Sequence, residues 1–445
     1  MQQNAFFETL APTKLFFRCA IPNMVAMAVT ALYMVADGIF VGLFVGQDAL
    51  AAVNLVMPLV MISFALSDMI AVGSSVQIAI RLGQKQDREA SSIFAFCSAL
   101  IVAISCVVGV AGFFLAEPAL RAMGADASVT ALAAAYLKVY ALFSPLIMIF
   151  FAVDNYLRIC GKVRYSMVLN VGISLLNILL DFWFIVVLHR GVASAALASC
   201  LSLALGSMLG FLPFLTKKLP LRFVKPSISL RLLGNILANG FSEFFSSIAG
   251  SVMMLILNGV LLRLSGSLAV AAFSIVMYVD SVVGALLFGM ADSMQPAISY
   301  CYGAGLRRRM FLLEKRVLAA GFCLSATALA GLLLWGGWVI SLFVQADNPA
   351  LLTMSLRAME LYSLSYLVGW IVTGLSSFFT ALDRPALSLL LAASRTLLFP
   401  LLGLSILPRL LQLDGVWLTP ALSGGLSAAL ALVFLLRVLR QEKAK

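Results

Sequence analysis

Long apolar runs follow one another along the whole chain, and short gaps that are charged or rich in Pro and Gly separate them. An α-helix needs about 20 such residues to cross the roughly 30 Å hydrocarbon layer of a membrane. The pattern predicts twelve segments of this length, at residues 18–44, 50–76, 91–115, 132–157, 165–188, 191–216, 231–262, 268–295, 311–343, 352–381, 385–407 and 415–437. The predicted fold class is therefore an all-α integral membrane protein with twelve transmembrane helices.

Composition supports this interpretation and excludes other classes of protein. Hydrophobic residues make up 62% of the 445 positions and charged residues 11%, and the mean hydropathy is +1.07. This balance does not fit a soluble globular domain. In a soluble chain the net charge of +11 would indicate a nucleic-acid partner. Here the basic residues lie in the gaps between apolar runs, so we expect the lipid bilayer and no nucleic acid as a partner.

The basic residues favour one side of the membrane. When alternate gaps are assigned to opposite sides, only Arg121, Arg190, Arg263 and Arg409 fall on one of them. The other side holds most of the remaining basic residues, among them the run Arg307–Arg309. Because loops rich in Lys and Arg stay in the cytoplasm, this split predicts a cell (inner) membrane protein with both termini cytoplasmic.

A basic linker at the midpoint, "TKKLPLRFVKPSISLR", separates two halves that resemble each other. The stretch "LAAVNLVMP" starting at Leu50 aligns with "VAAFSIVMY" starting at Val270. Further matches at nearby offsets pair Gly83 with Gly303, Tyr140 with Tyr362 and, within one residue, Asp37 with Asn258. These matches predict two pseudo-symmetric six-helix lobes, residues 1–216 and 231–445, joined by a cytoplasmic linker at residues 217–230. Parallel repeats of this kind suit a transporter that rocks about a central cavity.

Polar residues line one face of the fifth predicted helix, which contains the run "SLLNILLDFWFIVVL". The spacing of 4, 4, 3 and 4 residues places on a single helix face Ser166, Asn170, Ser174, Asn177 and Asp181. On the first predicted helix, Asn23, Thr30 and Asp37 recur every seven residues. Each of the two polar stripes therefore ends in a carboxylate.

The two carboxylates call for a different interpretation from the other polar residues. Amides and hydroxyls in such stripes commonly form interhelical hydrogen bonds, and we interpret Asn23, Thr30 and Ser166 in this way. A carboxylate near the centre of a bilayer costs at least ~2.5 kcal/mol and normally serves a function. Two acids that face a common interior make a site that takes up a cation or a proton. We therefore assign Asp37 and Asp181 to such a site.

Several other acidic residues lie within apolar runs. Asp154 precedes Arg158 by four residues, a spacing that predicts an ion pair at a helix end. The sequence suggests no partner for Asp68, Asp280 or Asp292.

The sequence predicts neither a metal site nor a cofactor. The seven cysteines have no Cys-x-x-Cys spacing, and His189 is the single histidine. We interpret the cysteines as free packing thiols.

At these residues the chain resembles the multidrug and toxic compound extrusion (MATE) transporters. The resemblance covers essentially the whole chain and rests on motifs in family order: "VADGIFVG" (35–42), "LAAVN" (50–54), "LRICGK" (157–162), "NILLDFWFI" (177–185), "NGFSE" (239–243) and "QPAISYCYGAG" (295–305). It implies a two-lobed antiporter that exports organic, mostly cationic or amphipathic compounds in exchange for protons or sodium ions. It also implies that the protein is not an enzyme.

The resemblance also assigns residues to sites. It implies an N-lobe coupling site at Asp37, Asn177, Asp181 and Ser199, where threonine is more common at the last position. Either a proton or Na⁺ could bind there, the latter at Asp37, Asn177 and Asp181. The glutamate of "NGFSE", Glu243, has no acidic partner on the tenth predicted helix, so a second cation site in the C-lobe is not expected. The candidate substrate cavity comprises Glu243, Asn239, Asn258, Gln295 and Tyr140.

Alternative functions differ in the features that they require. A lipid-linked oligosaccharide flippase of the same superfamily usually has fourteen spans and a more basic cavity. A major facilitator transporter would carry a different basic motif where this chain has "RLGQKQDREA", and a membrane enzyme would need a histidine or acid cluster at a helix end. A passive channel stays an alternative, although an acid pair in one lobe favours coupled transport. We expect a monomer that binds small organic molecules, with proton coupling preferred over sodium coupling.

Overall fold

A computed structural model describes residues 5–45, 47–122, 127–216, 219–343 and 349–443. Within these ranges the chain forms helices and no strand. The first half contains α1 (Ala5–Thr9), α2 (Pro12–Phe40), η1 (Val41–Val45), α3 (Gln47–Gly83), α4 (Asp87–Ala122), α5 (Ala127–Ile147), α6 (Ile149–Ile159), α7 (Val163–Asp181), η2 (Phe182–Val187) and α8 (Val192–Leu215). The segments η1 and η2 are π-helical turns that continue α2 and α7.

The second half repeats this plan with longer continuous helices. It contains α9 (Leu230–Gly303), α10 (Arg307–Ser341), α11 (Pro349–Ser363), α12 (Tyr366–Ala381), α13 (Pro385–Ala393), the π-helical turn η3 (Ser394–Leu398) and α14 (Phe399–Lys443). Ser229 caps the start of α9, because its side chain accepts a hydrogen bond from the Leu232 backbone N–H at 3.2 Å. Pro385 occupies the first turn of α13, where a proline costs no helical hydrogen bond.

Two of these helices consist of two arms. The helix α9 turns back at Ser265 and Gly266, where Gly266 has φ +69°, a conformation that glycine adopts without steric penalty. The helix α14 breaks at Gln412, which has φ 51°. The pair α11 and α12 is bent by 51° between Ser363 and Tyr366.

The helices account for the predicted number of spans. By length and hydropathy, nine of the described helices could cross a membrane, or ten when the bent α11–α12 pair counts as one span. The breaks in α9 and α14 each divide one of these spans into two. Counting both parts of each raises the number of possible crossings in the described part of the chain from ten to twelve. The predicted all-α class with twelve transmembrane helices is therefore confirmed.

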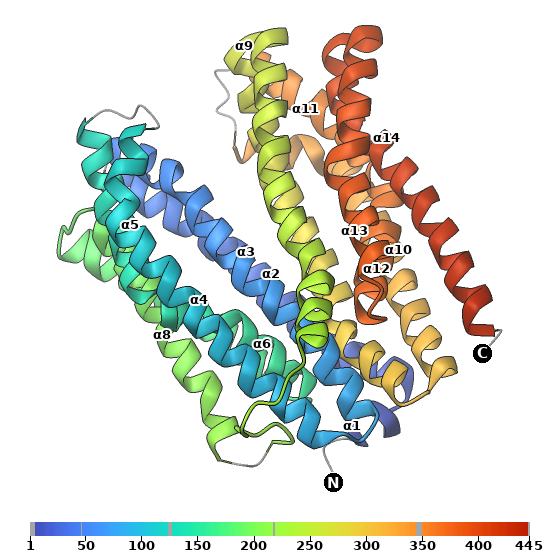
Figure 1. The fold of residues 1–445 in the computed structure, drawn as a ribbon. Helices are drawn as coiled ribbons and strands as arrows, with labels where there is room; N and C mark the ends of the chain where they lie inside the picture. Colours follow the sequence, from blue (N-terminus) through green and yellow to red (C-terminus); the bar gives the residue numbers. More distant parts are fainter. Residues whose placement is uncertain (1–4, 46, 123–126, 217–218, 344–348, 444–445) are drawn as a thin grey trace.

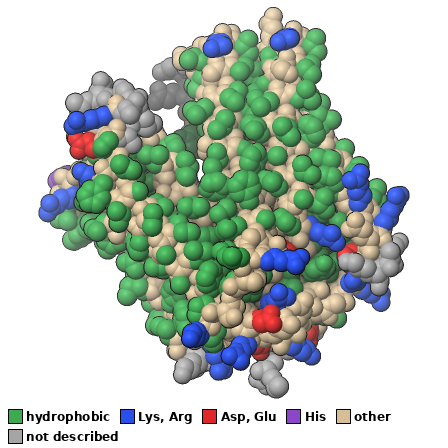
Figure 2. All heavy atoms as spheres, viewed as in Figure 1, with side chains coloured by type: hydrophobic (Ala, Val, Ile, Leu, Met, Phe, Trp, Pro, Cys, Tyr) green, Lys and Arg blue, Asp and Glu red, His purple; other side chains and the backbone are tan. Residues whose placement is uncertain are grey.

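The two halves form two helical lobes that diverge from one end of the molecule (Figure 1). Both chain termini lie toward the end where the lobes meet, which we call the termini face. On the opposite side the molecular surface is hollowed between the lobes (Figure 2). The helices therefore enclose a space that opens away from the termini face.

The buried apolar residues follow the same division. One cluster belongs only to the first lobe and includes Val56, Tyr136 and Ala196. A second belongs only to the other lobe and includes Phe273 and Trp417. The largest cluster joins residues of both lobes, such as Ile78 and Phe94 with Tyr300 and Phe378. Packing of the two lobes against each other is thus concentrated near the termini face.

Glycines let the two lobes approach at backbone distance there. A Cβ atom on Gly83 of α3 would lie 2.2 Å from the carbonyl oxygen of Tyr300 in α9. A Cβ atom on Gly303 of α9 would lie 2.2 Å from the carbonyl oxygen of Ile80 in α3. Gly83 and Gly303 are the glycines that the internal repeat aligned, so the contact obeys the pseudo-symmetry of the chain.

A second crossing of α3 and α9 has the same character. A Cβ atom on Gly73 would meet the Ile236 carbonyl oxygen at 1.9 Å, and one on Gly240 would meet the Met69 carbonyl oxygen at 1.8 Å. Small residues allow such close helix contacts in membranes, where packing replaces the hydrophobic effect between helices. We call the two crossings together the inter-lobe seam.

Polar bonds supplement this seam. The Asn23 side chain in α2 donates to the Gly289 carbonyl oxygen in α9 at 2.7 Å. The Gln77 amide in α3 donates to the Asp383 carboxylate, in the turn between α12 and α13, at 2.7 Å. Burial raises the pKa of Asp383, whereas the bond from Gln77 acts in the opposite direction. Both bonds join the first lobe to the second.

A bulky residue at the seam should destabilise the closed contact. We expect Gly240→Leu to lower the thermal unfolding temperature of the purified protein in detergent, because overpacking costs about 1–3 kcal/mol. The matched control is Gly172→Leu, since a Cβ atom on Gly172 meets nothing within 4 Å. Equal unfolding temperatures for the two variants would contradict the close crossing of α3 and α9.

Candidate functional site

The carboxylates of Asp37 and Asp181 meet inside the first lobe. Asp37 lies in the last turn of α2, and Asp181 is the last residue of α7. Their side chains are 7% and 0% exposed, and the two carboxyl groups are within hydrogen-bonding contact. One carboxylate oxygen of each has no hydrogen-bond partner among the described residues. Neither forms an ion pair with a described Lys or Arg.

Asn177 and Ser199 complete this cluster. With the Asn177 amide oriented to satisfy its neighbours, its nitrogen donates to Asp181 at 3.0 Å. Its oxygen then accepts from the Ser199 hydroxyl at 2.9 Å and from the Ser199 backbone N–H at 3.2 Å. The structure therefore brings together all four residues that the sequence assigned to the N-lobe. We call Asp37, Asn177, Asp181 and Ser199 the acid-pair site.

Tyrosines surround the acid-pair site. Tyr140 lies within hydrogen-bonding reach of Ser199, and its ring stacks on that of Tyr136 with centroids 5.2 Å apart. Tyr33 lies close enough to Asp37 and Asp181 to interact with them electrostatically.

The positions of these tyrosines differ from the sequence-based assignment of Tyr140 and add two residues to the surroundings of the site. Tyr140 was assigned to the substrate cavity, and the structure places its side chain, 8% exposed, beside the acid-pair site. The sequence did not single out Tyr33 or Tyr136. The four-residue spacing of Tyr136 and Tyr140, which puts both on one face of α5, could have indicated Tyr136. The position of Tyr33, four residues before Asp37 on the polar face of α2, could have indicated Tyr33.

The other end of the α7 stripe contacts α6. Asp154 accepts hydrogen bonds from the Ser166 hydroxyl at 2.5 Å and from the Asn170 amide at 2.7 Å. Its second carboxylate oxygen lies 3.3 Å from the guanidinium of Arg158. The ion pair predicted from the spacing of Asp154 and Arg158 is therefore confirmed.

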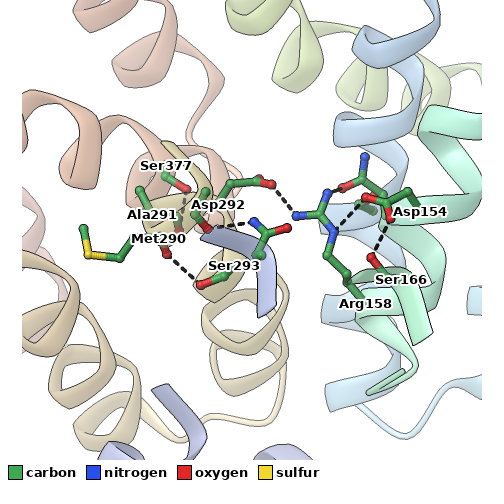
Figure 3. A network of polar contacts seen from close by, with 12 residues as sticks. Asp154, Arg158, Ser166, Met290, Ala291, Asp292, Ser293 and Ser377 are labelled. Carbon is green, nitrogen blue, oxygen red and sulfur yellow. Dashed lines mark hydrogen bonds and ion pairs between the residues drawn. The ribbon is translucent and has the colours of Figure 1, made fainter. Parts of the chain in front are cut away.

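Arg158 also reaches across to the second lobe (Figure 3). Its guanidinium forms an ion pair with Asp292 of α9 and donates to the Asn155 side chain at 2.7 Å. Arg158 is only 4% exposed. The sequence gave no partner for Asp292, because the two residues are separated by 134 positions. Arg158 thus joins an acid of each lobe.

Two further acids flank the seam without an ion pair among the described side chains. Asp68 precedes Met69, whose carbonyl oxygen faces Gly240, and Glu243 follows Gly240 by three residues. Both are half-buried. The charged groups that act on Glu243 are Asp68, Asp292 and Arg395.

A separate polar cluster lies within the second lobe. The Tyr366 hydroxyl donates to Asp280 at 2.8 Å. Arg395 of η3 donates to the Thr373 hydroxyl at 3.0 Å and lies over the ring of Phe288, 5.3 Å from its centroid. The second lobe therefore holds an arginine close to its buried acids, whereas the acid-pair site has no such cation.

The remaining cavity candidates differ in their surroundings. The Asn239 side chain is fully buried, and its amide donates to the Thr380 carbonyl oxygen at 3.0 Å. Gln295 is 4% exposed, and Asn258 is half-buried on α9. Asn239 thus has a partner within its own lobe.

The donor set limits the chemistry of the acid-pair site. Within the described residues no group of three or more His, Cys, Asp and Glu side chains could hold a metal ion. The acid-pair site instead offers carboxylate, amide and hydroxyl groups. Such groups can bind a proton or a hard monovalent cation.

Comparison with known proteins agrees with this architecture. The MatE family model matches residues 22–183 and 244–403. Multidrug export protein MepA of Staphylococcus saprophyticus is 24% identical over 94% of this chain and 90% of its own length. The MepA of Staphylococcus aureus is 23% identical over 74% of each chain.

Solved structures share the fold over the full length. The crystal structure of a MATE protein in complex with MaL6 has a TM-score of 0.95 at 24% identity and covers 100% of both chains. A multidrug resistance MATE family transporter in an outward-facing conformation has a TM-score of 0.92 at 25% identity, covering 100% of this chain and 99% of its own. The protein is therefore a multi-pass membrane protein that belongs to the multidrug and toxic compound extrusion (MATE) family of efflux transporters, which are not enzymes.

Proposed function

We propose that this protein is an antiporter that exports organic, mostly cationic or amphipathic compounds in exchange for a cation, by alternating access. The observation that carries the proposal is the buried acid pair Asp37–Asp181, which has no Lys or Arg partner within 4 Å among the described residues. Two carboxylates cannot both stay ionised and unneutralised in an apolar interior. A mobile cation that binds and leaves is the simplest way to balance them.

The orientation in the cell membrane follows from the distribution of charge. Basic residues are concentrated at the ends of the helices on the termini face, so this face is cytoplasmic under the positive-inside rule. The hollow between the lobes then opens to the outside, and the inter-lobe seam closes the cytoplasmic side. The structure would correspond to the outward-facing state, as in the relative whose description names that conformation.

The proton is the preferred coupling ion. When the Asn177 amide is oriented to satisfy its neighbours, its nitrogen faces Asp181, and an N–H group cannot coordinate Na⁺. A single proton shared between Asp37 and Asp181 would lower the charge of the pair from −2 to −1 and remove the repulsion between the two carboxylates, which titrate as a unit. Sodium binding at Asp37, Asn177 and Asp181 would require the amide to rotate, which would remove its bond to Asp181 and leave its nitrogen donating to the Ser199 hydroxyl at 2.9 Å. Inward movement of one such cation through a membrane potential of 100 mV supplies ~2.3 kcal/mol to drive export.

The proposed substrate class rests on the two acids beside the inter-lobe seam. Asp68 and Glu243 stand on opposite lobes beside the seam, half-buried and without ion pairs in the described part of the chain. Carboxylates in this position attract a positive charge, and the surrounding helices supply apolar surface. The relatives named multidrug export proteins support a broad range of such compounds. The closed seam is a poor fit to a passive channel.

Neutralising either acid of the pair should abolish coupled transport. We expect Asp37→Asn and Asp181→Asn each to lose gradient-driven efflux of a cationic dye in proteoliposomes, because the remaining carboxyl group lacks the acidic partner with which it holds the ion. Folding should persist, since each variant removes a buried charge. The matched control is Glu117→Gln, whose carboxylate is half-exposed and pairs with Arg121. Full transport by either variant of the pair would contradict the acid-pair site.

The identity of the ion can be tested by imposing each gradient alone. We expect an inwardly directed proton gradient to drive efflux in the absence of sodium, because a shared proton removes the repulsion within the pair without rotating Asn177. A protonophore should collapse this efflux. Transport driven by a sodium gradient at equal pH and zero potential would instead show that Na⁺ is the coupling ion.

A further inference from the structure

The acid-pair site and the inter-lobe ion pair lie at opposite ends of one polar stripe. Asn177 and Asp181 belong to the acid-pair site, and Ser166 and Asn170 on the same face of α7 bind Asp154. Asp154 in turn holds Arg158, the residue that bonds to Asp292 of the second lobe. A single helix therefore contacts both the ion site and the support of the bond between the lobes. Figure 3 shows the second of these contacts, from Ser166 to Asp154 and on to Arg158 and Asp292.

The bond between the lobes depends on this support. Arg158 is almost fully buried and must be held by acids and hydrogen-bond acceptors. Asp154 and Asn155 hold it from within its own lobe, and Asp292 holds it from the other lobe. When Asp154 keeps its bonds to Ser166 and Asn170, its carboxylate is fixed in position beside Arg158. A shift of α7 would move Asp154 and with it the guanidinium.

We propose that α7 transmits occupancy of the acid-pair site to the Arg158–Asp292 bond, with Ser166, Asn170 and Asp154 as positioning residues. This inference rests on the proposed function. Binding of the coupling ion from outside draws the Asp37 and Asp181 carboxylates together and moves α7. Asp154 then withdraws from Arg158, the bond to Asp292 weakens, and the cytoplasmic seam opens to release the ion. Without the ion, the stripe holds the seam closed.

The hydrogen bonds of the α7 side chains show which of them contact Asp154 and which do not. The Asn170 amide and the Ser166 hydroxyl leave their own helix to reach Asp154. The Ser174 hydroxyl, on the same face, donates only to the Asn170 carbonyl oxygen one turn earlier at 2.9 Å. Ser174→Ala is therefore a matched control for Asn170→Ala and Ser166→Ala.

Cys301 offers a native reporter of seam opening. It is 0% exposed and follows Tyr300, whose carbonyl oxygen faces Gly83 across the seam. With the other six cysteines replaced by serine or alanine, alkylation of Cys301 from the cytoplasmic side measures how often the seam opens. The assay uses inside-out vesicles with a membrane-impermeant maleimide outside, and either an acidified or a sodium-loaded lumen.

The proposal predicts a distinct response for each variant. In the parent protein, the rate of Cys301 alkylation should rise roughly fivefold or more when the lumen supplies the coupling ion. A fivefold change is roughly the lower end of typical allosteric couplings. Asn170→Ala and Ser166→Ala should lose most of this response, and Ser174→Ala should keep it. In Asp292→Asn, Cys301 should be alkylated rapidly with or without the ion. Adding Asn170→Ala to Asp292→Asn should not change the alkylation rate further, because both substitutions act on the same bond.

The outcomes separate this proposal from the proposed function. If the ion accelerates alkylation in the parent and in Asn170→Ala and Ser166→Ala alike, the link through α7 is wrong although ion coupling stands. If Ser174→Ala loses the response as fully as Asn170→Ala, the effect belongs to α7 as a whole and the assigned residues are wrong. If the ion has no effect in the parent, and Asp37→Asn still transports, the proposed function fails as well.

Discussion

A buried pair of carboxylates with no ion-pair partner among the described residues is the constraint on which the account of this transporter depends. Asp37 and Asp181 meet in the interior of one lobe, where water cannot solvate them. In the second lobe, Arg395 lies near the buried acids, so that lobe carries its own positive charge. No described Lys or Arg pairs with Asp37 or Asp181, and in the proposed function the cation that balances them comes from outside the chain.

The inter-lobe seam determines from which side of the membrane the space between the lobes can be reached. Backbone contacts at Gly73 and Gly240 and at Gly83 and Gly303 bring α3 and α9 together at the termini face. Polar bonds of Asn23, Gln77 and Arg158 cross between the lobes, and the largest apolar cluster also joins the two lobes at this face. Opening the seam therefore breaks both kinds of contact. A shared core near one face, and separate cores in each lobe beyond it, suit two rigid bodies that rock.

Sequence reasoning recovered the features that repeat at short range. The twelve spans follow from hydropathy, and the acid-pair site follows from helical spacing together with family motifs. The contact of Arg158 with Asp292 could not be predicted, because it joins residues 134 positions apart. The placement of Tyr140 depended likewise on how α5 packs against α8, which no periodicity in a single helix reveals. Long-range packing decided each of these cases.

Proton release on substrate binding tests the central claim most directly. Purified protein in weakly buffered detergent solution is mixed with a cationic substrate, and the pH is followed with an indicator dye. The account predicts that the parent protein releases protons, because substrate and proton favour opposite states of the acid-pair site, and that Asp37→Asn and Asp181→Asn release none. Substrate binding without proton release in the parent, or undiminished release from both variants, would contradict the account.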